Sequence, residues 1–412
     1  MHRKILILVL MLAMLTACAP QATPQPTAPV TEQAPVAVIT APQVNLTDGC
    51  VAEGEFDPSL DYFPEKAVLT HTDGFSIKYY NNYKVITVNS PSPGASESMQ
   101  YALVQCGTPA PQGFIAEQII DVPVMTIATM STTYLPFLDE LGLLDRLVGL
   151  DDATSVSNPT VLQMAAEGKL AMLGYGAGIN VEQALDLDPD LIMTYSSGSP
   201  EYDAHPVLIE AGLKVAVNAE WLDTSPLGRA EWGKFIAVFF NKEAEAEALF
   251  DQTVRQYDEL TALTAGITDK PTVFANTGYQ GTWSMPGGNS FAAAFMKDAG
   301  ANYLWADDPA TGSLPLSFET VFEQARDADF WLNIGFFATQ NDLLAADARY
   351  ADFAAFQSGS IWNNDAKTTA TGGNDYYESA VAHPDVVLAD LIKIFHPDLL
   401  PEHELVYYRL VQ

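Results

Sequence analysis

Histidines could bind a metal or transfer protons, and three of the six, His383, His396 and His403, occur near the end of the sequence. His383 and His396 directly precede proline at expected helix boundaries, which is typical of caps and surface positions. "HELVY", which begins at His403, lacks the second histidine of a zinc protease motif. The segment 122–222 contains a single histidine, His205. We therefore expect no protein-bound metal, and direct Zn²⁺ or Mn²⁺ transport stays an alternative.

Catalytic motifs are the next possibility. "GYGAG" at 174–178 is too short for a dinucleotide fingerprint, which requires a strand before it and a helix start after it, so a turn is expected. No serine stands in a nucleophile elbow, and no nucleophile neighbours a suitable base. The sequence therefore predicts a protein that is not an enzyme, with no catalytic residues and no cofactor.

One phrase occurs twice. "NVEQALDLDPDLIMTYS" (180–196) and "SFETVFEQARDADFWLNIG" (317–335) each begin with a capping residue, Asn180 or Ser317, and continue with an apolar residue and a glutamate, Glu182 or Glu319. Each then continues as a short helix, an aspartate and an apolar run. The simplest role of each glutamate is to complement the helix dipole. The repetition itself predicts two similar lobes.

The first residues resemble an export signal. Met1–Lys4 is basic, Ile5–Leu15 is apolar but too short to span a bilayer comfortably, and "LTAC" ends at Cys18. This ending resembles the lipobox of bacterial lipoproteins, which predicts a signal peptide over 1–17, a lipid on Cys18 and a position outside the cytoplasm. An ordinary secretory signal with a chance cysteine is the alternative. The Pro-, Thr- and Gln-rich segment that follows predicts a tether over 18–48.

Cys50 and Cys106 remain in a compartment that is not reducing, which favours a disulfide over two unpaired buried thiols. The formal net charge is −33, from 52 acidic against 19 basic side chains. This charge argues against nucleic acid or anionic lipid as a partner. A chain of 412 residues is also too long for a single core.

The texture of the chain changes near residue 122. Before it, "FSIKYYNNYKVITV" and "MQYALVQ" predict antiparallel strands. After it, strands and helices alternate, which predicts α/β lobes with largely parallel sheets. "KEAEAEALFDQTVRQYDELTALTAG" predicts one long helix between the two lobes. The expected divisions are a small β-rich extension (49–121), an N-terminal α/β lobe (122–225), an interlobe helical region (226–265) and a C-terminal α/β lobe with terminal helices (266–412).

Together the lipobox, tether, two α/β lobes, long interlobe helix and paired "ExxxxLxPDLI"-type phrase resemble the substrate-binding lipoproteins of ABC importers for iron complexes and cobalamin. "PLGRAEW" and the final segment from "GGNDYYESAV" onward also resemble that family, and the similarity covers about 122–395. The resemblance implies a fold of the class III periplasmic-binding-protein type, a small-molecule metal complex as ligand and a permease dimer with its ATPase as partner. It also implies a monomer held at the membrane only by its lipid anchor.

The resemblance gives the repeated glutamates a second role. In such proteins one exposed glutamate on each lobe docks on an arginine pocket of a permease subunit, and Glu182 and Glu319 occupy the matching places. Two acids at a fixed separation would provide both register and electrostatic steering.

Ligands of such folds bind where strand ends and lobe edges face one another. Most of the candidates at these places are aromatic, which suits a flat, partly apolar metal complex, and about half of the aromatic ones are expected to be core residues. Arg229 could bind a ligand oxygen or could pair with Glu231 or Asp223. The candidates are Thr132, Tyr134, Tyr175, Trp221, Arg229, Trp283, Phe336, Phe337, Tyr376 and Tyr377.

The ligand class is only partly determined. Binders of strongly anionic siderophores present several basic residues, whereas the second lobe here offers little beyond Arg349 and Lys367. A tris-catecholate is therefore disfavoured, and a hydroxamate or citrate-like iron chelate, cobalamin or haem remains open. A ligand-sensing lipoprotein without an importer is a further alternative.

Overall fold

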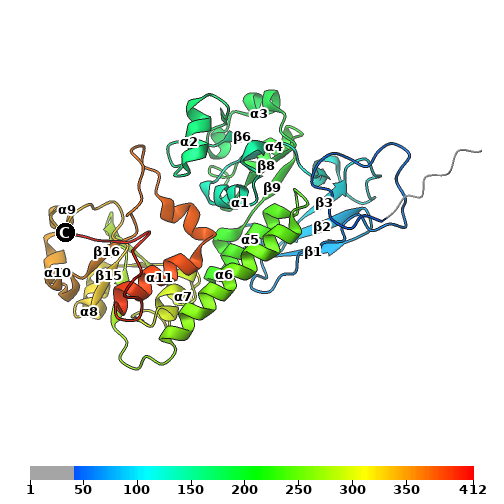
Figure 1. Ribbon diagram of the computed structural model, residues 1–412. Helices are drawn as coiled ribbons and strands as arrows, with labels where there is room; N and C mark the ends of the chain where they lie inside the picture. The colour runs from blue at the N-terminus through cyan, green and yellow to red at the C-terminus, as the bar shows by residue number, and fades with distance from the viewer. Residues whose placement is uncertain (1–40) are drawn as a thin grey trace, which may run out of the picture. The chain divides into compact units, whose positions relative to one another are not determined.

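The computed structural model describes residues 41–412, which form one compact unit (Figure 1). The signal peptide over 1–17, the lipidation of Cys18 and most of the tether lie outside the described residues. Among the described residues, no helix combines the length and apolar character needed to cross a membrane.

The N-terminal extension contains a four-stranded sheet in the order β1-β2-β3-β4. The "NN" turn forms a hairpin as predicted, with β1 and β2 antiparallel and β3 antiparallel to β2. The antiparallel pairing predicted for these strands is confirmed, and a fourth strand that was not predicted, β4, pairs with β3 in parallel. Cys50 and Cys106 form a disulfide. The elements are β1 (Phe75–Tyr79), β2 (Tyr83–Val88), β3 (Met99–Gln105), the short 3-10 helix η1 (Ala116–Gln118) and β4 (Ile119–Val122).

The N-terminal lobe is built on a five-stranded parallel sheet in the order β7-β6-β5-β8-β9. The chain moves from β5 towards β7, then returns to the other side of β5 to form β8 and β9. The strands are β5 (Ile127–Thr129), β6 (Leu147–Leu150), β7 (Ala171–Met172), β8 (Leu191–Thr194) and β9 (Val215–Val217). The helices are α1 (Leu135–Glu140), α2 (Pro159–Ala166), α3 (Val181–Leu187) and α4 (His205–Glu210), with the 3-10 turns η2 (Thr132–Tyr134), η3 (Leu144–Arg146), η4 (Gly176–Gly178) and η5 (Glu220–Leu222).

The C-terminal lobe repeats this plan in the order β13-β10-β15-β16-β17, in which only the edge strand β17 is antiparallel to its neighbour. A second, three-stranded sheet in the order β11-β12-β14 packs beside it. The strands are β10 (Thr272–Ala275), β11 (Gly278–Tyr279), β12 (Thr282–Pro286), β13 (Asn302–Tyr303), β14 (Ser313–Leu316), β15 (Phe330–Leu332), β16 (Ile361–Asn363) and β17 (Arg409–Leu410). The helices are α7 (Phe291–Asp298), α8 (Phe318–Ala325), α9 (Gln340–Ala346), α10 (Ala354–Ser358) and α11 (Pro384–Phe395), with the 3-10 turns η6 (Ala348–Asp352), η7 (Asp375–Tyr377) and η8 (Ser379–Val381).

The repeated phrase forms the same local structure in both lobes. Asn180 caps α3 by accepting from the Gln183 N–H, and Ser317 caps α8 in the same way. In each copy, the aspartate just before the apolar strand then forms hydrogen bonds to the neighbouring strand. Asp190 accepts from the Thr126 N–H at 2.9 Å, and Asp329 accepts from the Thr272 N–H at 2.8 Å. In both lobes the aspartate N–H donates back to the threonine hydroxyl at 3.0 Å.

Two helices, α5 (Pro226–Ala237) and α6 (Glu243–Thr264), join the lobes (Figure 1). Eleven of the twelve residues of α5 are buried. Leu227, near its start, belongs to the hydrophobic core of the C-terminal lobe, whereas Trp232 and Phe235 belong to that of the N-terminal lobe. Each end of α5 is therefore held by a different lobe.

The buried helix α5 carries two charges that the extension satisfies. The carboxylate of Glu231 accepts from the N–H groups of Thr70, His71 and Thr72 at 2.7–2.9 Å. Lys234 donates to Glu231 at 3.1 Å. Burial alone would raise the pKa of Glu231, but these donors and Lys234 lower it, so the carboxylate stays charged.

A second buried pair joins the extension to the start of α6. Lys84 on β2 is fully buried, and its ammonium donates to Glu243 at 2.5 Å, to Asn241 at 2.8 Å and to the Val238 carbonyl at 2.6 Å. Burial lowers the pKa of Lys84, and Glu243 opposes that shift. Asn45 donates to the other carboxylate oxygen of Glu243 at 2.8 Å. All three donors of Lys84 are therefore satisfied without water.

Replacing Lys84 with Met should destabilise the protein strongly, because it leaves the Glu243 charge buried without its cation. The expected loss is about 3–5 kcal/mol in the free energy of unfolding, measured by urea denaturation. The double variant Lys84→Met/Glu243→Leu should recover most of that loss, since no charge remains buried. A double variant as unstable as the single one would contradict the assigned pairing.

Candidate functional site

The carboxyl edge of the N-terminal sheet carries an acid among tyrosines. Asp151 follows β6 and Tyr195 follows β8, and both line one pocket with Tyr175 and Tyr202. Tyr175 and Tyr202 are exposed, at 52% and 59%. Burial raises the pKa of Asp151 to about 6, although a hydrogen bond from the Asp152 N–H opposes the shift. The pocket therefore combines phenol groups with a carboxyl group that titrates close to neutral pH.

The loop after β8 is fixed by one carboxylate. Asp203 is buried and accepts from the Ser196 hydroxyl at 3.1 Å, the Ser197 N–H at 2.6 Å and the Gly198 N–H at 3.1 Å. The carboxylate accepts hydrogen bonds from backbone N–H groups of the loop that would otherwise donate to water. The loop that carries Tyr202 therefore has an internal anchor.

Arg229, on α5, lies where the two lobes meet. Its guanidinium pairs with Glu220 of the N-terminal lobe, with an Nη2 to Oε2 distance of 2.6 Å. It also stacks over the ring of Phe291 on α7 of the C-terminal lobe, 4.3 Å from the centroid. Burial raises the pKa of the nearby Tyr376 hydroxyl to about 12, and the positive charge of Arg229 opposes this rise. The partner of Arg229 is therefore Glu220, and the alternative of a pairing with Glu231 or Asp223 is wrong.

Aromatic and amide side chains lie at the carboxyl edge of the C-terminal sheet. Asn276 after β10 and Asn333 after β15 adopt left-handed backbone angles, with φ of 66° and 56°. Asparagine tolerates this region better than most residues, so both strands turn sharply at equivalent places. Phe336 has a fully exposed side chain, and Tyr377 is 58% exposed. A fully exposed phenylalanine at a strand end gives the lobe an apolar contact surface.

The two lobes also touch through the segment between β16 and α11. Glu378 is buried, and its carboxylate accepts from the N–H groups of Ser157 and Asn158 at the start of α2, both at 2.7 Å. His383 lies 3.0 Å from Glu140 on α1. These residues border an open cleft of about 480 Å³ between α1, α2 and this segment. The C-terminal lobe therefore supplies a cap to a helix of the N-terminal lobe.

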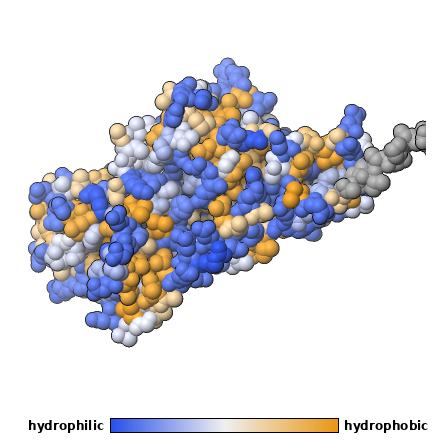
Figure 2. All heavy atoms as spheres, viewed as in Figure 1, coloured by the Kyte–Doolittle hydropathy of each residue, from blue (hydrophilic) through white to orange (hydrophobic). Residues whose placement is uncertain are grey.

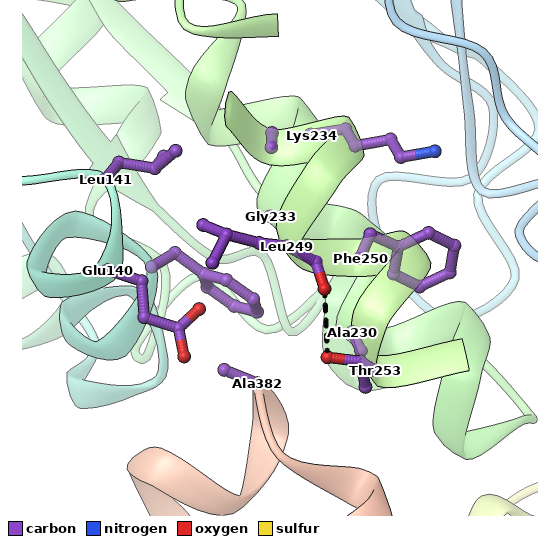
Figure 3. Close-up of a pocket in the computed structure, with 11 residues that line it drawn as sticks. Glu140, Leu141, Ala230, Gly233, Lys234, Leu249, Phe250, Thr253 and Ala382 are labelled. Carbon is purple, nitrogen blue, oxygen red and sulfur yellow. Dashed lines mark hydrogen bonds between the residues drawn. The ribbon is translucent and has the colours of Figure 1, made fainter. Parts of the chain in front are cut away.

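Figure 3 shows the junction behind this contact, where Glu140 and Leu141, α5, α6 and Ala382 surround a small cavity. The cavity holds about 20 Å³, which is room for about one water molecule. It is too small for a metal complex. The open cleft of about 480 Å³ between the lobes is the better candidate for a ligand.

The predicted ligand residues divide into three groups. Trp283 has no exposed surface, and its indole N–H donates to the Ala275 carbonyl at 2.8 Å. Tyr134 is 1% exposed. Placing these two at a cleft surface was wrong, because their rings fill the space over the sheets. Thr132, Arg229, Phe337 and Tyr376 are half-buried, and Tyr175, Trp221, Phe336 and Tyr377 are exposed near strand ends.

Sequence reasoning missed Asp151, Tyr195, Tyr202 and Glu378. Asp151 and Tyr195 directly follow strands, so the rule used for the other candidates would have found them. Glu378 gives no comparable signal, because its partners are backbone groups of the other lobe. Within residues 41–412, no three His, Cys, Asp or Glu side chains are grouped so that they could hold a metal ion.

Comparison with known proteins agrees with this architecture. The family described as periplasmic binding protein matches residues 127–368, which is more than half of the chain. The chain belongs to the periplasmic binding protein family. The match begins at β5, so the extension over 41–121 lies outside the matched region.

Two relatives in this comparison are uncharacterized lipoproteins of Methanocaldococcus jannaschii. One is 27% identical over 293 residues, which cover 68% of this chain and 67% of the relative. The other is also 27% identical, over 325 residues that cover 75% of this chain and 79% of the relative.

Solved structures of the periplasmic binding protein fold are similar at low identity. A periplasmic haem-binding protein from Roseiflexus has a TM-score of 0.52 and 21% identity, covering 67% of this chain and 99% of its own. CeuE of Helicobacter pylori in a nickel–histidine complex has a TM-score of 0.52 and 15% identity, covering 68% and 86%. A binding protein from Veillonella parvula has a TM-score of 0.54 and 13% identity, covering 79% and 99%.

The raised pKa of Asp151 predicts a pH dependence of stability. A group whose pKa is raised to about 6 on folding stabilises the folded state below its ordinary value of 3.8, and this contribution is lost as pH rises through about 6. The melting temperature of the wild type should therefore fall relative to that of Asp151→Asn between pH 4 and pH 6.5. Thermal unfolding at several pH values measures the difference.

The neighbouring variant Asp152→Asn is the control for that experiment. Hydrogen bonds from Thr154 lower the pKa of Asp152, so its contribution should stay constant between about pH 5 and pH 7. A difference in melting temperature between the wild type and Asp151→Asn that stays constant from pH 4 to pH 6.5 would refute the prediction for Asp151.

Replacing Glu378 with Ala should loosen the contact between the lobes. It removes two hydrogen bonds from backbone N–H groups at the start of α2, each worth about 0.5–1.5 kcal/mol in comparable measurements. Amide hydrogen exchange of Ser157 and Asn158 should become at least about tenfold faster. The variant Glu402→Ala, at an exposed position, should leave that exchange unchanged. Equal exchange rates in all three proteins would show that the contact does not hold the lobes.

Proposed function

We propose that the protein is the extracytoplasmic, lipid-anchored substrate-binding component of an ABC importer and that it captures an iron chelate for the permease. Membership of the periplasmic binding protein family supports solute capture, and the lipobox-like "LTAC" and the two related lipoproteins support the anchor. Structurally similar proteins described as iron-binding or haem-binding, or solved with nickel bound, support a metal complex as the solute.

The observation that carries the choice of ligand is the pairing of cations near the strand ends. Arg229 pairs with Glu220, and Arg409 pairs with Asp365 at 2.7 Å. Lys367 lies 3.7 Å from Asp375. The exposed groups that remain beside them are mainly aromatic or acidic. Such a surface favours a neutral or cationic complex over an anionic one.

A ferric hydroxamate fits this surface best, because it offers apolar arms and a metal centre without a high negative charge. Tyr175, Trp221 and Phe336 would provide rigid apolar contacts, and Thr132 would provide a polar one. Cobalamin or haem is the second candidate, favoured by the same aromatic groups and by the haem-binding neighbour. Glu182 and Glu319 are the proposed contacts with the permease dimer, which its ATPase drives.

Tryptophan fluorescence of the purified protein tests this proposal. Trp221 is 37% exposed and Trp362 is half-buried, whereas Trp232, Trp283, Trp305 and Trp331 are buried, so quenching by a ligand should come mainly from Trp221. Titration should show saturable quenching with a ferric hydroxamate, cobalamin or haem and none with a ferric catecholate, Zn²⁺ or Mn²⁺. Because several of these ligands absorb strongly, each titration includes a free-tryptophan control for inner-filter loss.

The variant Trp221→Phe provides the matched control. It should lose most of the quenching while calorimetry still detects binding of the same ligand. Quenching by Zn²⁺ or Mn²⁺ alone would replace the chelate with a free metal ion. Tight binding of the catecholate alone would overturn the electrostatic argument.

A further inference from the structure

Glu182 and Glu319 occupy equivalent positions in the two lobes. Each is the second residue of a capped helix, α3 or α8, and each is exposed. Figure 1 shows these helices in different lobes. If both acids met the same kind of surface, their surroundings would be expected to match.

The surroundings differ because of Arg349. Its Nη1 lies 3.1 Å from Glu319 Oε1, and its Nη2 lies 2.6 Å from Asp347 Oδ2. The guanidinium also stacks over the ring of Phe318, 3.8 Å from the centroid. Two carboxylates and an aromatic face thus hold one cation at the start of α8.

This cation borders an open groove of about 360 Å³ beside Glu319. The β11–β12 hairpin forms one side of the groove, and Phe318 and Tyr350 contribute aromatic surface. An aromatic face between carboxylates suits a guanidinium better than a lysine ammonium. The planar guanidinium can stack on the ring and donate forked hydrogen bonds to the carboxylates at the same time. Arg349 therefore occupies a place that would suit an arginine of another protein.

The N-terminal lobe has no such cation. Glu182 follows Val181 where Glu319 follows Phe318, so no aromatic ring supports a guanidinium there. Within residues 41–412, Glu182 forms no ion pair, and the opposite end of the same short helix carries the exposed acids Asp186 and Asp188. The N-terminal lobe thus presents unpaired negative charge, and the C-terminal lobe presents an acid that already has a partner.

We propose that Arg349 is an internal competitor for the basic docking surface of the permease, so that the two lobes dock unequally. This inference rests on the proposed function. The N-terminal lobe engages a permease arginine through Glu182 without giving up any contact. The C-terminal lobe engages only when an arginine of the permease takes the place of Arg349 between Glu319 and Phe318. Arg349 thereby weakens docking and favours release after delivery.

The effect should be moderate, because both groups of the Arg349–Glu319 pair are largely exposed, at 52% and 76% of their side chains. Exposed ion pairs and stacked cations of this kind are displaced easily. Removing Arg349 should therefore strengthen docking by about three- to tenfold.

Docking can be measured with the full-length protein and the permease–ATPase complex in lipid nanodiscs. Interferometry would give dissociation constants for the wild type and for Arg349→Gln, Glu182→Ala, Glu319→Ala and Arg349→Gln/Glu319→Ala. Arg326→Gln is the matched control, because Arg326 is an exposed arginine at the end of the same helix and pairs with Asp327. Thermal unfolding would verify that every variant is folded.

The expected result is tighter docking of Arg349→Gln, a steeper dependence of its affinity on salt, and no change for Arg326→Gln. The gain should disappear in the Glu319→Ala background, which isolates the coupling between the two residues. If both glutamate variants dock more weakly but Arg349→Gln docks like the wild type or worse, the competitor role is wrong while the proposed function stands. If the wild type does not dock, or neither glutamate variant weakens docking, the proposed docking and this inference both fail.

Discussion

The burial of all but one residue of α5 is the constraint on which the arrangement of the protein depends. A helix with almost no solvent-exposed face must be covered on nearly every side, and here the extension and both lobes cover it. Glu231 and Lys234 would be costly in that position if the extension did not supply three N–H groups and a carbonyl. The extension, which lies outside the family match, therefore satisfies charges on the element that joins the lobes.

The two lobes are similar because the same chemistry organises both sheets. In each, an aspartate directly before one strand, β8 or β15, exchanges hydrogen bonds with a threonine at the start of the neighbouring strand, β5 or β10. This exchange fixes where neighbouring strands begin, and so aligns their carboxyl ends at one edge. Side chains that follow these strands, such as Asp151 and Phe336, then lie at that edge of their sheets.

Charge is distributed unequally over this shared plan. The cations near the strand ends have acidic partners, while within residues 41–412 the Asp151 carboxyl at the N-terminal edge forms no ion pair and lies among tyrosines. The starts of α3 and α8 also differ in charge, because Arg349 pairs with Glu319 on α8 and no cation pairs with Glu182 on α3 within residues 41–412. Hydrophilic residues predominate on the face shown in Figure 2, with hydrophobic patches between them, as the net charge of −33 would suggest. A few ion pairs thus distribute charge unequally over a strongly acidic protein.

The sequence by itself determined the two α/β lobes, the long joining helix and the places of Glu182 and Glu319, because periodicity and capping are local properties that a repeated phrase makes visible. It also placed Tyr175, Trp221 and Phe336 near strand ends. Only the tertiary structure decided that Trp283 and Tyr134 are core residues, that β4 runs parallel to β3, and that Arg229 pairs with Glu220. The contacts of Glu378 and Arg349 likewise join residues far apart in the chain. Such pairings depend on how whole elements pack, and no spacing within the sequence encodes them locally.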